Sequence, residues 1–252
     1  MSGREETGKG KKGKFLIIKP PTKSSRERFD ATPDGTSRVP EQTFEDLYFS
    51  KAYGVNYDRR NPPEKMRYYL DRIREIQPHG SLLDVGCGYG LFVDLARQYF
   101  QVTGCDISAH ALEIARNRFP HIPFVRSEVQ NLSLEDTFEV VTCFDVLEHV
   151  PDLSGALRSI SVRLKPEGII VITVPVYDTA VGALVGILDK DNTHVWKQGR
   201  KFWRESLRSS GFEIMKDIGL WRYFLFGKRY IFFGSDVWRN FSPAILLIGK
   251  KR

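Results

Sequence analysis

The chain has 252 residues, and its 38 Lys and Arg against 31 Asp and Glu give a formal net charge of +7. With 41% hydrophobic and 27% charged residues it has the composition of a globular protein, which excludes a fibrous, collagen-like or wholly disordered chain. The three cysteines, Cys87, Cys105 and Cys143, have no CxxC spacing, so neither a disulfide framework nor a zinc site is indicated.

The positive charge is concentrated at the two ends of the chain. Residues 1–43 and 220–252 each carry more basic than acidic side chains, whereas residues 44–219 carry slightly more acidic ones. Any contact with an anionic partner is therefore expected to involve the ends. The first segment mixes Lys, Gly, Ser, Thr and Pro without periodicity, which predicts a disordered basic tail over 1–43 and one folded domain over 44–252.

Neither a secretory signal nor a membrane span is predicted. The apolar run at 15–18 is too short for a signal-peptide core. The longest apolar stretch, 169–188, is interrupted by Pro175, Asp178 and two glycines. We therefore expect a cytoplasmic protein in a reducing compartment.

The folded domain is predicted to begin with a helix and to continue as alternating strands and helices. Asn61 can cap the first helix, Pro62 suits its first turn, and Pro78 ends it. From residue 81 a βαβ rhythm predicts a mostly parallel sheet covered by helices. The expected strands are 81–85, 101–105, 123–125, 139–144 and 168–174, and the expected helices are 90–99, 109–118 (capped by Ser108) and 152–164.

The last part of the chain is predicted to hold a helix over 201–209 and two strands over 212–219 and 244–249. No crossover helix is recognisable between these strands, so one of them is expected to run antiparallel. Between them, residues 221–241 form an aromatic-rich insertion or lid, whose composition suits an acceptor pocket, an anionic membrane surface or ordinary packing against the sheet. Its aromatic and basic residues are Trp221, Tyr223, Phe224, Phe226, Tyr230, Phe232, Phe233, Trp238 and Phe241, with Arg222, Lys228, Arg229 and Arg239.

A glycine-rich segment marks the end of the first predicted strand. Gly86, Gly88 and Gly90 stand at alternate positions before a helix, where the backbone can approach a ligand and the helix N-terminus can receive an anionic group. The dinucleotide pattern G-x-G-x-x-G is not met, because Leu91 stands in the last position. Asp84 precedes the loop, where it can orient the backbone or meet a cationic ammonium, and its charge disfavours phosphate.

Acidic residues also follow the next two predicted strands. Asp106 ends the second strand, where a carboxylate can accept hydrogen bonds from both hydroxyls of a ribose, although it can also serve only as the acid at a helix start. Glu128 follows the third strand and can accept a hydrogen bond from an adenine amino group while Val129 offers its backbone N–H, although Glu128 can equally be a surface residue. These residues indicate an adenosine-type ligand.

Taken together, these segments resemble the class I S-adenosylmethionine-dependent methyltransferases. The resemblance covers about residues 60–219 and is closest to the branch that methylates small molecules, including quinone-precursor O-methyltransferases. It rests on Asp84-Val85-Gly86-Cys87-Gly88-Tyr89-Gly90, Asp106, Phe138-Glu139-Val140-Val141, Leu147-Glu148-His149-Val150 and Leu164-Lys165-Pro166-Glu167-Gly168. It implies a Rossmann-like α/β fold with a seven-stranded, mostly parallel sheet, helices on both faces and an antiparallel last strand.

The same resemblance implies a set of residues that bind S-adenosylmethionine. The glycine loop with Asp84 would contact the methionine part, Asp106 the ribose and Glu128-Val129 the adenine, and Phe144 would lie near the sulfonium. Family members usually have Asp at the position of Glu128. The predicted cofactor-binding residues are Asp84, Gly86, Cys87, Gly88, Gly90, Asp106, Ile107, Glu128, Val129 and Phe144.

Two histidines are candidate catalytic bases. Methyl transfer from a sulfonium is an in-line displacement, and a base helps an oxygen nucleophile by removing its proton. His149 follows the fourth strand, where it can act as the base or only shape the cofactor pocket, and His194 follows the fifth strand, in a segment that usually helps to build the acceptor pocket. Asp145, Glu148 and His149 also resemble a Glu-x-x-Glu-His set proposed to hold a divalent metal, but no metal is predicted here, since a capping or surface role suits Asp145 better.

The function expected from the resemblance is methyl transfer to a small molecule, at an oxygen of an aromatic, quinone-like or lipid-like metabolite. An RNA methyltransferase using the basic ends is the alternative. It is disfavoured because Cys143-Phe144-Asp145-Val146 stands where enzymes acting on exocyclic base nitrogens place an Asn/Asp-Pro-Pro-aromatic motif. A non-catalytic cofactor-binding protein stays open, because a fold alone does not establish catalysis. Peripheral membrane contact is expected, if anywhere, through the basic aromatic late segment.

Overall fold

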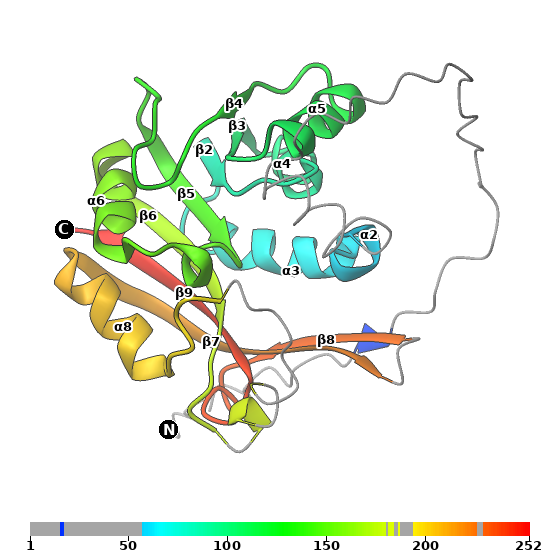
Figure 1. Ribbon diagram of the computed structural model, residues 1–252, viewed down its shortest axis with the longest axis vertical. Helices are drawn as coiled ribbons and strands as arrows, with labels where there is room; N and C mark the ends of the chain where they lie inside the picture. The colour runs from blue at the N-terminus through cyan, green and yellow to red at the C-terminus, as the bar shows by residue number, and fades with distance from the viewer. Residues whose placement is uncertain (1–15, 18–56, 180, 184–185, 187–193, 226–228) are drawn as a thin grey trace, which may run out of the picture.

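The computed structural model describes residues 16–17, 57–179, 181–183, 186, 194–225 and 229–252. The predicted tail over 1–43, apart from Leu16 and Ile17, lies outside the described residues, as does the start of the predicted domain at 44–56. Within the described part, one sheet runs through the molecule with helices on both faces (Figure 1). The predicted α/β class is therefore confirmed.

The sheet has the strand order β1-β8-β7-β9-β6-β5-β2-β3-β4. Neighbouring strands from β4 to β6 are parallel, and β9 lies antiparallel between β6 and β7. The seven strands from β7 to β4 are those expected from the sequence, with the last strand antiparallel. They are β2 (Gly80–Val85), β3 (Phe100–Asp106), β4 (Phe124–Arg126), β5 (Phe138–Phe144), β6 (Leu164–Pro175), β7 (Phe212–Leu225) and β9 (Ala244–Lys251).

Two further strands extend the sheet to nine. Strand β7 does not end near residue 219 as predicted, but continues to Leu225 and turns back as β8 (Arg229–Ser235). Strand β1 (Leu16–Ile17) adds to the outer edge of β8. Much of the predicted aromatic insertion is thus a β-hairpin that projects from one side of the molecule (Figure 1). The stacked rings of Trp221 and Phe233, 5.7 Å apart between centroids, pair across this hairpin.

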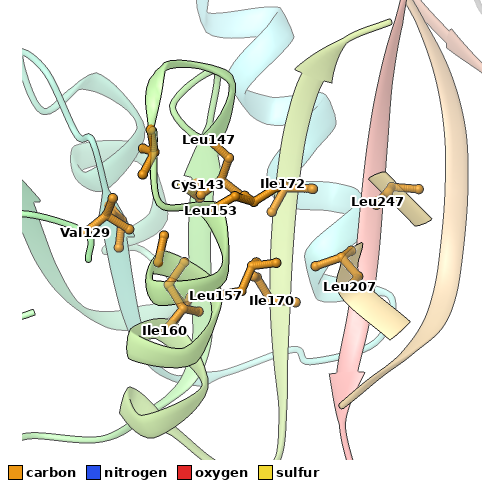
Figure 2. Packing of buried hydrophobic residues seen from close by; sticks show 14 of the residues in the cluster. Val129, Cys143, Leu147, Leu153, Leu157, Ile160, Ile170, Ile172, Leu207 and Leu247 are labelled. Carbon is orange, nitrogen blue, oxygen red and sulfur yellow. The ribbon is translucent and has the colours of Figure 1, made fainter. Parts of the chain in front are cut away.

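Helices cover the sheet because successive strand residues face opposite sides, and both sets are apolar. On β6, Ile170 and Ile172 belong to a buried cluster with α6 and α8, while Ile169 and Val171 belong to another with α3 and α4. Figure 2 shows the first cluster, in which Leu157 and Ile160 of α6 face β5 and β6. The helices are α2 (Tyr57–Arg60), α3 (Pro63–Arg74), α4 (Leu91–Ala96), α5 (Ala109–Arg118), α6 (Leu153–Arg163), α8 (Arg200–Ser209) and the short 3₁₀ turn η3 (Leu147–His149).

The helix ends agree with the sequence at one cap and differ at another. The Ser108 side chain accepts a hydrogen bond from the Ala111 backbone and caps α5 as predicted. Asn61 does not cap α3: its amide group donates to the Tyr57 carbonyl and its oxygen accepts from Lys65, so Pro62 takes the cap position without a side-chain bond.

Among the described residues, no helix is both long and apolar enough to cross a bilayer.

Candidate functional site

The glycine loop connects β2 to α4 at the carboxyl edge of the parallel strands. Gly86 and Gly88 have φ values of 75° and 52°, a left-handed conformation that glycine adopts without strain. Space is also limiting, since a Cβ on Gly86 would lie 2.2 Å from Val146 and one on Gly88 would lie 2.2 Å from the Tyr57 hydroxyl. The two glycines therefore let the loop pack closely against Val146 and Tyr57 in a backbone conformation that other residues adopt only with strain.

Asp106, the last residue of β3, fixes this loop. Its Oδ2 accepts a hydrogen bond of 2.8 Å from the Gly88 backbone N–H, and its Oδ1 accepts one of 2.9 Å from the Ser108 backbone N–H. A carboxylate oxygen can accept more than one hydrogen bond, so both oxygens retain capacity for ligand hydroxyls. Asp106 thus joins the glycine loop to the start of α5 at the point predicted to hold a ribose.

Asp84, on β2, is buried with only 3% of its surface exposed. Its Oδ1 accepts a hydrogen bond of 2.6 Å from the Thr142 hydroxyl of the neighbouring strand β5. Burial raises the pKa of Asp84 to about 7, an effect that the bond from Thr142 opposes and the nearby Asp106 reinforces. Near neutral pH the carboxyl therefore exists in both forms, and a cation beside it would favour the ionised one.

These residues surround one cavity of about 670 Å³. It lies at the point where the strand order reverses, since β3 is on one side of β2 and β5 is on the other. In open α/β sheets this crevice is the usual ligand site. Of the predicted site residues, Asp84, Gly86, Cys87, Gly88, Asp106, Ile107, Val129, Phe144 and His149 line it. The lining residues that sequence reasoning did not select include Asn61, Lys65, Met66, Phe92, Ser127 and Gln130.

The two candidate histidines lie side by side, with ring centroids 4.6 Å apart. The backbone N–H groups of Val195 and Trp196 donate to the Glu148 carbonyl at 2.9 and 3.1 Å, which holds the segment after β6 against η3. His149 lines the cavity, whereas His194 is not among the lining residues and has its Nδ1 3.1 Å from the Tyr177 hydroxyl. The two histidines that the sequence offered as alternative bases are therefore neighbours, and of the two only His149 lines the cavity.

Comparison with known proteins identifies the family. The chain matches the family described as methyltransferase domain over residues 57–216, which is more than half of its length. It belongs to this family. It is 38% identical over 96 residues to the ubiquinone biosynthesis O-methyltransferase of Albidiferax ferrireducens, covering 35% of this chain and 38% of that protein. The chain spans less than half the length of the curated relatives it matches.

Solved structures share the fold of this methyltransferase domain. A S-adenosylmethionine-dependent methyltransferase from Thermotoga maritima, a possible histamine N-methyltransferase, has a TM-score of 0.62 at 18% identity, covering 82% of this chain and 100% of that one. The N-methyltransferase NodS from Bradyrhizobium japonicum, in complex with S-adenosyl-L-homocysteine, has a TM-score of 0.57 at 15% identity, covering 82% and 96%. The predicted Rossmann-like methyltransferase fold is therefore confirmed.

The cavity of the methyltransferase domain fits S-adenosylmethionine, the cofactor of this family. Its volume lies in the range of small-molecule sites. The cofactor carries an ammonium and a sulfonium group, and the cavity wall offers two buried carboxylates, Asp84 and Asp106. Gly86 and Gly88 of the glycine loop line the same cavity.

Two predicted cofactor contacts do not line this cavity. Glu128 is exposed and pairs with Asn131 in an isolated β-bridge, while its neighbours Ser127 and Val129 face the cavity. Gly90 begins α4, and a Cβ there would lie 2.9 Å from the Phe124 ring, so it permits packing rather than ligand approach. For both residues, contact with the cofactor stays a prediction without support from their position.

Glu148, His149 and His194 bring potential metal-ligand atoms within 4.8 Å of one another. This group differs from the Asp145-x-x-Glu148-His149 set considered from the sequence. Asp145 instead pairs with Arg222 of β7 and accepts a hydrogen bond of 3.0 Å from the Thr173 hydroxyl. Burial acts to raise the pKa of Asp145, but Arg222 and Lys65 together hold it below its usual value. Arg222 thus lies inside the molecule and adds nothing to a basic surface.

Proposed function

We propose that the protein transfers the methyl group of S-adenosylmethionine to an oxygen of a small aromatic, quinone-like or lipid-like acceptor. The observation that carries this proposal is the continuity of the cavity. A single space extends from Asp106 and the glycine loop to Phe92, Phe144 and His149. Cofactor and acceptor can therefore meet within one continuous cavity, which is the positioning that an in-line displacement requires.

S-adenosylmethionine supplies an electrophilic methyl group on its sulfonium when it is bound. The chain orients the acceptor and excludes water: the rings of Phe92 and Phe144, 4.8 Å apart between centroids, form an apolar wall. The acceptor oxygen forms a bond to the methyl carbon as the carbon–sulfur bond breaks, and the electron pair stays on sulfur. The hydroxyl proton of the acceptor passes to a ring nitrogen of His149.

His194 supports this role of His149. The hydroxyl of Tyr177 and the Nδ1 of His194 lie within hydrogen-bond distance at 3.1 Å, and the two imidazole rings are neighbours. A proton taken up by His149 therefore has a polar neighbour in His194. We propose His149 as the base and His194 as the residue that positions it.

The proposal is tested in two steps. Isothermal titration with S-adenosyl-L-homocysteine measures cofactor-site binding, which we expect in the micromolar range typical of such sites. Mass spectrometry of a panel of phenols, catechols, hydroxyquinones and hydroxylated lipids, incubated with methyl-labelled cofactor, then identifies a methylated product. Binding without any product across the panel would favour the non-catalytic alternative, and no binding at millimolar cofactor would remove the basis of the proposal.

Methylation of RNA receives less support from the site. The two basic ends of the chain were the motive for that alternative, and none of the described residues over 220–225 and 229–252 of the later end lines the cavity. A salt-dependent RNA shift assay is the direct test, since binding through phosphate contacts weakens steeply with ionic strength. We expect no specific shift.

We further propose a cytoplasmic protein that contacts anionic membranes through the turn before β9. Val237, Trp238 and Phe241 are 84%, 58% and 60% exposed, and Arg239 lies among them. Exposed aromatic rings beside a cation suit the headgroup region of a bilayer. The full chain is expected to cosediment with phosphatidylserine vesicles more than with phosphatidylcholine vesicles, and Trp238→Ser should reduce this. Val162→Ser, at a residue 58% exposed on α6, is the matched control.

A further inference from the structure

Lys65 has an unusual position for a lysine. It lies in the first turn of α3, where the helix dipole disfavours a positive charge, and only 5% of its surface is exposed. Its side chain lines the cavity. The Nζ group donates to the Arg60 carbonyl at 3.3 Å and to Asn61 Oδ1 at 3.0 Å. Both acceptors are neutral, so the charge of Lys65 is solvated by dipoles and has no direct counter-ion there.

The nearest acid, Asp145, is already engaged by other groups. It forms an ion pair with Arg222 and accepts a hydrogen bond from Thr173. Among the described residues, no carboxylate lies within ion-pair distance of Lys65. Lys65 and Arg222 together carry two positive charges against the single negative charge of Asp145. Of these two cations only Lys65 lines the cavity, while Asp145, which also lines it, is neutralised by Arg222.

A buried charge without a counter-ion is costly, and the surroundings of Lys65 reflect this cost. Burial lowers the pKa of Lys65 to about 8; Asp145 opposes this effect, whereas Arg222 and Arg60 reinforce it. An anion that entered the cavity beside Lys65 would relieve the imbalance. The ammonium has three N–H donors, of which two have acceptors, so one remains for a ligand.

The wall around Lys65 is otherwise apolar and aromatic. Met66, Phe92 and Phe144 line the same cavity, and Phe144 also contacts the Tyr69 ring at 4.9 Å between centroids. Asp84 and Asp106, the carboxylates suited to the cationic cofactor, belong to β2 and β3, whereas Lys65 belongs to α3. The two portions of the cavity therefore differ in charge: one suits a cation and the other an anion attached to an apolar body.

We propose that Lys65 binds the methyl acceptor, and that the acceptor is a small aromatic acid whose ionised oxygen, a carboxylate or an acidic phenolate, contacts the Lys65 ammonium. This inference rests on the proposed function, because it assigns the portion of the cavity that the cofactor leaves open. It narrows the acceptor from any hydroxylated metabolite to one that carries a negative charge.

The carboxylate form is tested by binding to the full chain saturated with S-adenosyl-L-homocysteine. The probes are 4-hydroxybenzoate and 3,4-dihydroxybenzoate, each compared by calorimetry with its neutral amide. We expect the acids to bind about 10- to 100-fold more tightly than the amides, as a charged hydrogen bond in a buried site allows. Lys65→Met, which keeps the apolar stem, should remove this preference, whereas Lys65→Arg should retain most of it. Lys201→Met, at a lysine whose side chain is 86% exposed, should have no effect.

The phenolate form is tested with 4-nitrophenol, whose ionised form absorbs visible light. Titration in the presence of the wild-type chain should show a lower pKa for bound than for free 4-nitrophenol, and Lys65→Met should abolish the difference. If the acids bind more tightly than their amides but the pKa of 4-nitrophenol is unshifted, the group that contacts Lys65 is a carboxylate. If only the pKa of 4-nitrophenol is lowered, that group is a phenolate.

Equal binding of acids and amides by the wild-type chain, together with an unshifted pKa of 4-nitrophenol, overturns the inference whatever the variants do. A preference for the acids that persists unchanged in a folded Lys65→Met also overturns it. Failure of the proposed function looks different, because S-adenosyl-L-homocysteine itself would then not bind.

Discussion

Replacing Asp84 by asparagine should stabilise the free protein and weaken its cofactor site. The usual pKa of an aspartate side chain is 3.8, whereas burial raises the pKa of Asp84 to about 7 in the native state. A raised carboxyl pKa means that the native state holds a proton which the unfolded chain releases more readily. The contribution of Asp84 to stability is therefore greatest below pH 4, declines as the pH rises from about 4 to 7, and stays low above that.

The magnitude follows from the difference between these two pKa values. At pH 8, keeping the ionised Asp84 carboxylate buried lowers the free energy of unfolding by an amount on the order of 4 kcal/mol. Asparagine keeps an oxygen that can accept the bond from Thr142, but it does not ionise. We expect Asp84→Asn to raise the free energy of unfolding by less than about 2 kcal/mol at pH 5 and by about 4 kcal/mol at pH 8.

The assay is urea denaturation of the cofactor-free chain at several pH values between 5 and 8. Asp58→Asn is the control, since the Asp58 side chain is 62% exposed and pairs with Arg118 only at the surface. That variant should change stability by less than about 1 kcal/mol, without growth toward pH 8. A gain for Asp84→Asn that is absent, or independent of pH, would refute the reasoning from burial.

The same group links cofactor binding to pH. If Asp84 meets the ammonium of the cofactor, the ionised form binds, so the affinity of the wild-type chain for S-adenosyl-L-homocysteine should rise between pH 6 and pH 8. Binding should also release a proton, which calorimetry in buffers of different ionisation enthalpy detects. In Asp84→Asn the affinity should be lower and nearly independent of pH, and a wild-type affinity without this rise would contradict the assigned contact.

Three further substitutions test the site and its support. Asp106→Ala should weaken binding of S-adenosyl-L-homocysteine by about 1–3 kcal/mol, because the ribose acceptor and the Gly88 anchor are both lost; unchanged affinity in a folded variant overturns this role. His149→Ala should lower kcat by about 10²- to 10⁴-fold while cofactor affinity is kept, measured on whichever acceptor the panel identifies; near-normal kcat would exclude it as the base. Arg222→Met should destabilise the fold by about 1–3 kcal/mol in urea denaturation, because Asp145, whose side chain is 26% exposed, loses its charged partner, and adding Asp145→Asn should recover part of this loss. Equal stability of Arg222→Met and the wild-type chain would show that the pair is solvated.

Local features of this protein could be predicted from the sequence because they depend on neighbours in the chain. The Ser108 cap, the glycine loop and the alternation of strands and helices arise from short-range hydrogen bonding, backbone sterics and apolar periodicity. The seven-stranded, mostly parallel sheet with its antiparallel last strand followed from the motifs that carry the resemblance. For the same reason the placement of Asp84, Asp106 and Phe144 around one cavity agrees with expectation.

Contacts between distant segments could not be predicted in this way. Arg222 pairs with Asp145 across 77 positions, and the sequence offered it only as one of several basic residues in an aromatic segment. The extension of β7 to Leu225 depends on its pairing with β8, so apolar periodicity alone did not reveal it. His149 and His194 became neighbours only through the backbone bonds to Glu148.

Residues close together in the chain thus encode the glycine loop and the alternation of strands and helices, and the family motifs indicate the fold class and the candidate residues. The electrostatics of these residues depends on how distant segments pack together. Asp84 has its raised pKa because strands, helices and loop together exclude water from it. Lys65, inconspicuous in the sequence, becomes a buried cation in the cavity wall for the same reason. Burial and the distance between charges are properties of the packed molecule, and they set the free energy of every ionised group.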